Sequence, residues 1–272
     1  MAVTSRKKQR ACIFTTIILS LVAVAVLATA IGTENWITSK PERIEITSPN
    51  TTSTNGNATG DPPVEKEKGA MRLGLFRAVG TLTRSPLQPK HVQLNITCGS
   101  GYCIYEYEEN DLNGALKAME DKGVNPQEVG LFSRGLFVSL MIFASLALIL
   151  GMVSAIFGLI NVVTKPIETI NGPLGLFIWN GLGFTFSLTT TLMYVWLFEK
   201  YLSVNYLPEK IINYEYYTAD ETWLDWSFYL TIVPVVCFLI NILLVFLSGI
   251  NFQPMLRRRE DISSNNPDMI LY

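Results

Sequence analysis

The chain has 272 residues, a net charge of −2 and 49% hydrophobic residues, averages that do not separate it from a soluble protein. Its apolar residues, however, are gathered in four blocks, and its charged residues lie between the blocks. This segregation argues against an ordinary soluble domain and places the chain in the membrane class. Nucleic acid is not an expected partner; the lipid bilayer and other membrane proteins are.

Four segments have the length and composition of membrane-spanning helices. A helix needs about 20 apolar residues to cross a hydrocarbon core about 30 Å thick. Charged residues are absent from the interior of each segment, where they are costly. The predicted spans are residues 11–31, 135–163, 174–198 and 228–250. The expected fold class is an all-α membrane protein: a four-helix bundle whose large extracellular loop holds a small β-sheet and a short helix.

The first segment has an alternative interpretation. Four basic residues precede it, and Ala28-Thr29-Ala30 resembles a signal-peptidase cleavage site. Its apolar run is longer than the usual signal-peptide core of about 7–15 residues, which favours an uncleaved helix. Under both interpretations the residues that follow are outside.

Charge asymmetry predicts the topology. Basic residues precede the first span, and Arg257, Arg258 and Arg259 follow the last, so both termini are expected in the cytoplasm of a multi-pass membrane protein. The remaining segments are then a cytoplasmic N-terminus (1–10), a first extracellular loop (32–134), a cytoplasmic turn (164–173), a second extracellular loop (199–227) and a cytoplasmic tail (251–272).

The first loop contains three acceptor patterns for N-linked glycans, at Asn50, Asn57 and Asn95. Residues 41–70 are polar and are predicted to be flexible. Beyond them, short strands are predicted at 73–76, 91–97 and 102–107, and a short helix at 111–122 that ends at Gly123.

Cysteine and histidine usage limits the chemistry. Cys98 and Cys103 flank a glycine-containing turn in the loop expected to be outside, so a disulfide is predicted, with two free thiols as the alternative. Cys12 and Cys237 lie within spans, and His91 is the only histidine. A nucleophilic triad therefore has no support. No enzyme activity, metal or cofactor is expected.

Polar and small residues inside the spans are predicted to pack helices together. Asn180 and Asn241 are interpreted as interhelical hydrogen-bonding groups, with a pore lining as the alternative. The second span carries two pairs at small-xxx-small spacing, Gly151/Ala155 and Ser154/Gly158. Whether their partner helix belongs to this chain stays open.

Two cytoplasmic segments carry further predictions. Proline and glycine make the turn between the second and third spans short and stiff; its marked residues are Lys165, Pro166, Glu168, Gly172 and Pro173. The ending Ile270-Leu271-Tyr272 fits the groove of a PDZ scaffold, with a disordered tail as the alternative.

Several blocks, spread in order over the chain, resemble the clarins. The most specific runs from Lys165 to Leu176 (KPIETINGPLGL); others are Gly32-Thr33 with Trp36-Ile37, Gly74-Leu75-Phe76, Trp179 to Gly183, Leu207 to Tyr214 and Ile270 to Tyr272. The insert at 41–70 and the cysteine positions depart from the family pattern.

The resemblance implies a non-enzymatic plasma-membrane protein of sensory, hair-cell-type cells that organises membrane complexes and the underlying actin. The alternatives are an auxiliary ion-channel subunit that binds its channel through the small-residue face, and a claudin-like junction protein. Claudins usually carry Gly-Leu-Trp where this chain has Gly74-Leu75-Phe76.

Overall fold

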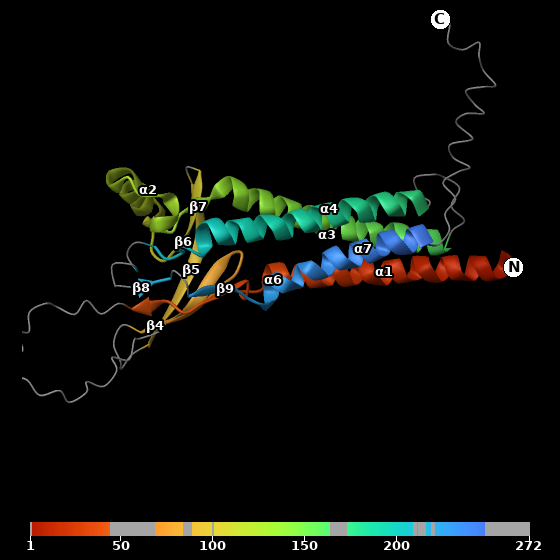
Figure 1. Cartoon of the computed structure of the whole chain (residues 1–272), viewed down its shortest axis with the longest axis horizontal. Coiled ribbons are helices and arrows are strands. Elements are labelled where there is room, and N and C mark those ends of the chain that lie inside the picture. The colour runs from red at the N-terminus through yellow and green to blue at the C-terminus, as the bar shows by residue number, and fades with distance from the viewer. Residues whose placement is uncertain are drawn as a thin grey trace, which may run out of the picture.

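The computed structural model describes residues 2–43, 69–83, 89–99, 101–163, 173–208, 211, 216–218 and 221–247. Long helices lie side by side in a bundle, and an antiparallel sheet caps one end of it (Figure 1). The helix α1 begins at the end of the bundle that lies away from the sheet.

The helices have these bounds: α1 Ala2–Gly32, α2 Asp111–Lys122, α3 Arg134–Val163, α4 Pro173–Leu197, α6 Trp226–Leu230 and α7 Ile232–Leu247. Within the described residues, four stretches are long and apolar enough to cross a membrane: Ala11–Gly32, Arg134–Val163, Leu174–Leu202 and Trp226–Leu247. The last stretch is interrupted between α6 and α7 because Pro234 has no N–H group for the carbonyl one turn earlier.

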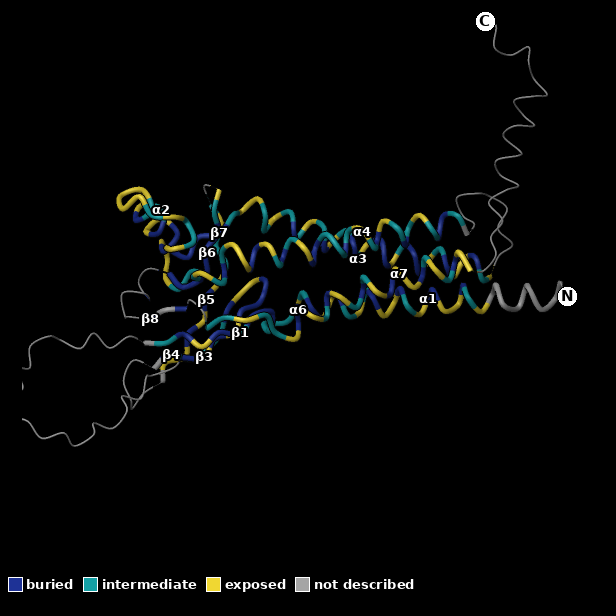
Figure 2. The backbone as a smooth tube through the Cα atoms, viewed as in Figure 1, coloured by how far each residue is buried: buried dark blue, intermediate teal, exposed yellow. Residues whose placement is uncertain are grey.

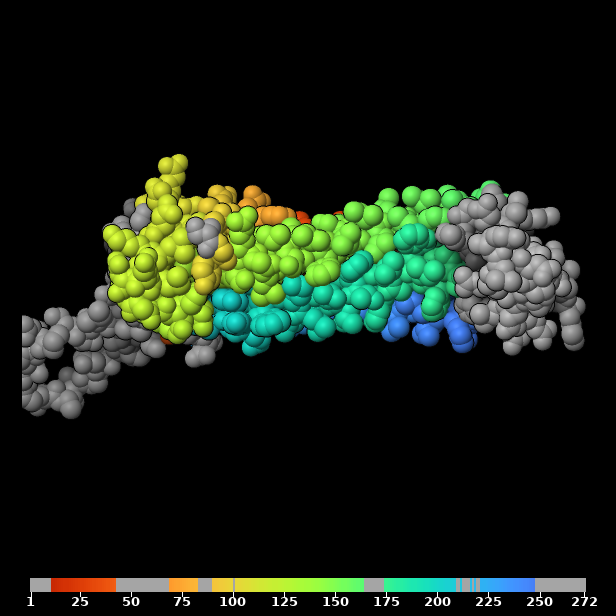
Figure 3. All heavy atoms as spheres, turned by 90° about the horizontal axis from the view of Figure 1, so that it is seen from above, coloured from red at the N-terminus to blue at the C-terminus, as the bar shows by residue number. Residues whose placement is uncertain are grey.

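Large apolar side chains cover the outward sides of these helices. Figure 2 shows exposed residues along the outside of the bundle and buried residues between the helices. Ile142, Ile149, Ile156 and Leu159 on α3 are each more than half exposed. In water such a surface would be strongly unfavourable, whereas lipid chains accommodate it. Figure 3 shows α3 and α4 running lengthwise along one face, with the segment around α2 at the sheet end.

The expectation of an all-α fold is wrong, because seven strands form one antiparallel sheet. Their order is β7-β6-β5-β4-β3-β1-β9. Their bounds are β1 Ile37–Ser39, β3 Ala70–Leu73, β4 Arg77–Thr83, β5 Pro89–Gly99, β6 Tyr102–Glu106, β7 Phe132–Ser133 and β9 Thr222–Leu224. A second, two-stranded sheet pairs β2 (Glu42–Arg43) with β8 (Tyr216–Tyr217).

The sheet is larger than predicted because strands from both loops enter it. Three-residue strands carry too little alternation to be recognised from sequence, and β1 and β9 are both of this length. They pair with each other, Ile37 opposite Leu224, although they lie far apart in the chain. The strand predicted at 73–76 is also wrong: β3 ends at Leu73, and the next three residues form a turn that leads into β4.

Gly74 explains that turn. Its N–H donates to the Arg77 carbonyl at 2.8 Å. A β-carbon at this position would lie 2.7 Å from the Thr33 carbonyl oxygen, at the end of α1. Only glycine therefore allows the turn to approach the helix end so closely.

The helix α2 spans the range expected from the sequence. Asp111 Oδ2 accepts hydrogen bonds from the N–H groups of Tyr107 and Glu108, each at 2.9 Å, at its start. Gly123 follows its last residue with φ 62°, the left-handed conformation that ends many helices. Further short elements are a 3₁₀ turn, η1, at Pro126–Val129 and a π-helical turn, η2, at Phe198–Leu202.

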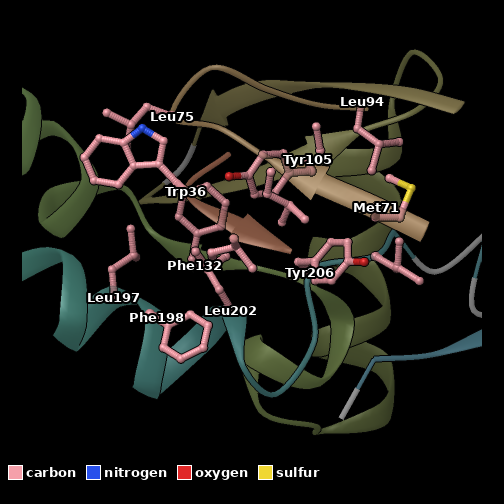
Figure 4. Packing of buried hydrophobic residues seen from close by; sticks show 14 of the residues in the cluster. Trp36, Met71, Leu75, Leu94, Tyr105, Phe132, Leu197, Phe198, Leu202 and Tyr206 are labelled. Atoms are coloured by element: carbon pink, nitrogen blue, oxygen red, sulfur yellow. The ribbon is translucent and has the colours of Figure 1, made fainter. Parts of the chain in front are cut away.

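A continuous apolar core joins the sheet to the bundle. Figure 4 shows Trp36, Tyr105 and Tyr206 between the strands and the end of α4. Trp36 is fully buried, its indole N–H donates to the Ala30 carbonyl at 2.6 Å, and its ring centroid lies 4.5 Å from that of Tyr194 on α4. Because side chains from strands, helices and loops share this core, the sheet and the bundle form one packed unit.

Candidate functional site

Two regions collect the polar side chains that could serve a function: the interior of the bundle and the face of the seven-stranded sheet that points away from the core. In the bundle, Asn241 on α7 is fully buried. Its Nδ2 donates to Asn180 Oδ1 on α4 at 2.8 Å and to Ser20 Oγ on α1 at 3.0 Å. The hydroxyls of Ser20 and Ser154 on α3 are 3.1 Å apart. One polar cluster thus connects all four long helices.

The hydrogen bonds of this cluster can fix the positions of the four helices relative to one another. Asn180 Nδ2 donates to the Leu176 carbonyl at 2.7 Å, and Asn180, Ser20 and Ser154 are fully buried. Interhelical hydrogen bonds of this kind contribute about 0.6–2 kcal/mol each in membranes. Sequence analysis identified Asn180, Asn241 and Ser154 but not Ser20. A serine in an apolar helix can instead bond its own backbone, as exposed Ser145 does to the Met141 carbonyl at 2.8 Å.

The small residues of α3 face α1 of the same chain. A β-carbon at Gly158 would lie 2.6 Å from Ile17 Cγ1, and one at Gly151 would lie 2.6 Å from Val24 Cγ2. Ala155 is buried on the same helix. These contacts answer the question of the partner helix that the sequence left open, and they make the first apolar segment an integral part of the bundle.

The second region is the open face of the sheet, defined as the face turned away from the apolar core. Strand β3 shows the alternation: Met71 and Leu73 are buried in the core, whereas Ala70 and Arg72 are exposed on the open face. Successive cross-strand partners form a row over this face: Thr38, Arg72, Val79 and Gln93. Such a row is fixed by strand register.

A groove of about 790 Å³ lies on the open face, over β1, β3, β4 and β5. Three basic residues, Lys40, Arg72 and His91, line it, and none of the described lining residues is Asp or Glu. The Lys40 ammonium lies 5.3 Å from the centre of the Trp223 ring on neighbouring β9. We call this site the open-face groove.

Two acidic side chains near this face, Asp225 and Glu34, have partners of their own, whereas Glu221 lies opposite Lys40 at the edge of the sheet. Asp225 accepts a hydrogen bond from Thr38 Oγ1 through one carboxylate oxygen and from the Trp226 N–H through the other, and so begins α6. Glu34 forms an ion pair with Arg77 beyond the groove. The carboxylates of Asp225 and Glu34 therefore interact with groups other than the basic residues of the groove.

The predicted loop features lie on strands β5 and β6. Cys98 and Cys103 form a disulfide that joins β5 to β6. Asn95 is exposed on β5, two residues beyond Gln93 and on the same face, so a glycan at Asn95 would border the groove. His91 is exposed on the same strand, and within the described residues no group of three His, Cys, Asp or Glu side chains could hold a metal.

Several predicted residues fall elsewhere. Pro173 begins α4. The remaining predicted positions lie outside the described residues: Asn50, Asn57, Lys165, Pro166, Glu168, Gly172, Ile270, Leu271 and Tyr272. Most of the insert at 41–70 also lies outside them.

Buried tyrosines between the sheet and the bundle were not predicted as a group. The Tyr105 hydroxyl donates to the Gly74 carbonyl at 2.8 Å, whereas Tyr206 Oη interacts with the Ser39 side chain without forming a well-aligned hydrogen bond. Burial raises the pKa of both phenols above the ordinary value. No local sequence signal distinguishes them from exposed loop tyrosines.

Known proteins resemble this chain over most of its length. A family model described as Clarin-2, or Clarin-2-like, matches residues 114–245. Clarin-1 of Mus musculus is 26% identical over 224 residues, which cover 74% of this chain and 91% of the relative. Clarin-1 of Homo sapiens is 25% identical over 227 residues, 75% of this chain and 92% of the relative. Clarin-3 of Rattus norvegicus is 26% identical over 196 residues, 71% of this chain and 64% of the relative.

These matches confirm the resemblance seen in the sequence blocks, and they agree with four apolar helices of membrane-spanning length. The chain is a multi-pass membrane protein that is similar to the clarins over most of its length.

Proposed function

We propose that the protein organises complexes at the plasma membrane of sensory, hair-cell-type cells and has no catalytic role. The observation that carries the proposal is the continuous core around Trp36, which fixes the sheet on the end of the bundle. A surface held rigidly at the end of a bundle of membrane-spanning length can hold a partner protein at a defined distance from the membrane. The sensory setting is what the resemblance to the clarins implies.

In this proposal both termini are cytoplasmic and the sheet is outside. The tail residues Ile270, Leu271 and Tyr272 would bind a PDZ scaffold linked to actin, and the bundle would remain in contact with lipid and other membrane proteins. Basic flanks on both terminal spans support the orientation.

The auxiliary-channel alternative loses its predicted docking face. It required the small-residue side of α3 to meet a pore-forming partner. Gly158 instead lies against Ile17, and Gly151 lies against Val24, both on α1 of the same chain. A channel partner would have to use another surface, and we make no proposal for one.

The test is proximity labelling from a tagged copy in polarised sensory epithelium, compared with a variant that lacks residues 270–272. We expect enrichment of scaffold and actin-linked proteins that disappears with the deletion. Enrichment of a pore-forming subunit in both samples, without scaffold proteins, would contradict the organiser role and favour the channel alternative.

A further inference from the structure

We propose that the open-face groove binds an acidic, extended segment from the extracellular region of a partner protein. This inference rests on the proposed function, because the predicted orientation presents the sheet to the extracellular space. It adds the chemical class of the extracellular partner and the residues that recognise it.

Charge is the first argument. The whole chain has a net charge of −2, yet the described lining of the groove contains Lys40, Arg72 and His91 and no acidic residue. The charged side chains that line the groove are therefore basic, whereas the net charge of the whole chain is negative. Complementary charge of this kind selects an anionic partner and raises its association rate.

The spacing of the basic residues is the second argument. Ser39 pairs with Met71, so the next residue, Lys40, lies opposite Ala70; Ala70 pairs with Thr81, and Thr81 pairs with His91. Lys40 and His91 thus stand three strand spacings apart, about 14 Å. That distance matches roughly four residues of an extended peptide at about 3.3 Å per residue.

Arg72 lies on a strand between those of Lys40 and His91, displaced by two residues along the strand direction. Its guanidinium can bind a carboxylate through two parallel hydrogen bonds. An extended segment crossing the strands, with acidic side chains at alternate positions, would place carboxylates near all three basic groups.

The remaining surface favours a peptide over a sulfated glycan. Ala70 and Val79 provide an apolar floor, and Trp223, 41% exposed, forms an aromatic rim beside Lys40. Tryptophan and arginine dominate the binding energy of protein interfaces. A sulfated glycan, which carries charged groups along its whole length, would make less use of these apolar contacts.

The experiment uses the full-length protein in nanodiscs of neutral phosphatidylcholine. The probes are two fluorescent nine-residue peptides, one of alternating Thr and Glu and one with Gln in place of Glu, with binding followed by fluorescence anisotropy. We expect the Glu peptide to bind at least about ten-fold more tightly at low salt, and this preference to shrink as salt screens the charges.

Arg72→Glu should abolish the preference, because Arg72 is central and its side chain is exposed. The matched control is Lys117→Glu, which makes the same change of net charge at an exposed position of α2, away from the groove. We expect the control to bind within about two-fold of wild type. Circular dichroism and size exclusion verify that both variants fold.

Equal affinity for the two peptides would overturn the proposal, as would equal weakening by Arg72→Glu and Lys117→Glu. Binding of a heparin hexasaccharide without binding of the Glu peptide would also overturn it and assign the groove to sulfated glycans. If peptide binding fails while scaffold labelling still depends on residues 270–272, only the groove assignment falls. Peptide binding without scaffold labelling would support the groove assignment and contradict the organiser role.

Discussion

Asn241 donates a hydrogen bond to Asn180 at 2.8 Å, and neither side chain is accessible to lipid or water. Because Asn241 also contacts Ser20, one amide links three helices, and Ser154 adds the fourth through Ser20. A buried polar group that finds its partners in only one helix arrangement favours that arrangement over others.

The first prediction concerns this pair. Asn241→Ala should lower the free energy of unfolding by about 1–3 kcal/mol, because it removes hydrogen bonds and leaves the Asn180 oxygen unpaired. Adding Asn180→Ala should cost less than the sum of the two single changes. Thermal unfolding in detergent provides the double-mutant cycle, with Ser145→Ala as the lipid-facing control. Additive effects would show that the two amides do not interact.

The second prediction compares two glycines in helices. Alanine usually stabilises a helix by about 1 kcal/mol relative to glycine. A β-carbon at Gly181 meets nothing within 4 Å, so Gly181→Ala should leave stability unchanged or raise it. At Gly158 the new atom would lie 2.6 Å from Ile17, so Gly158→Ala should destabilise the bundle. Thermal unfolding of both variants is the measurement. Equal stability would show that α1 does not pack closely on α3.

The third prediction concerns two buried phenols in the core that joins sheet and bundle. Tyr105→Phe should lower stability by about 1 kcal/mol, because its hydroxyl donates to the Gly74 carbonyl. Tyr206→Phe should cost less than Tyr105→Phe, since its buried hydroxyl makes no well-aligned hydrogen bond among the described residues. The contrast between the two variants is measured by thermal unfolding, and a larger loss for Tyr206→Phe would contradict it.

The fourth prediction concerns alkaline pH. Burial raises the pKa of Tyr105, and the nearby Tyr206 raises it further; burial also raises the pKa of Tyr206. An unfolded tyrosine titrates near pH 10, so above about that pH the unfolded state loses protons that the folded state retains. Stability should therefore be constant from neutral pH to about pH 9 and fall above about pH 10.

The matched control for that fall is the variant carrying both Tyr105→Phe and Tyr206→Phe. Each phenol contributes a slope of up to about 1.4 kcal/mol per pH unit, so the double variant should lose stability less steeply above about pH 10. If wild type and the double variant lose stability equally steeply above about pH 10, the buried phenols are not the cause of the fall.

Sequence reasoning identified the parts of the fold that depend on local pattern. Apolar length located the four long helices, and Gly123 marked the end of α2. It missed the full sheet because β1 and β9 become strands only by pairing with each other and with β3. Pairing across such a distance leaves no periodic signal in either segment.

Some residues of the candidate site could likewise be predicted from the sequence, and others could not. Asn180 and Asn241 stand out because amides are rare in apolar helices, whereas Ser20 does not. Lys40, Arg72 and His91 form no local motif, because long stretches of chain separate them. Strand register alone brings them to one groove, so their combined charge emerges only in the folded sheet.

The pairing of β1 with β9 also sets an order of assembly during synthesis. The strand β1 follows the first long helix, whereas β9 leaves the ribosome only after α3 and α4 have been made. Until then the edge of β1 that later receives β9 is exposed, and unpaired edges invite pairing with other chains. Nascent chains halted before β9 should therefore depend on chaperones, and premature stop codons upstream of Thr222 should yield aggregation-prone fragments.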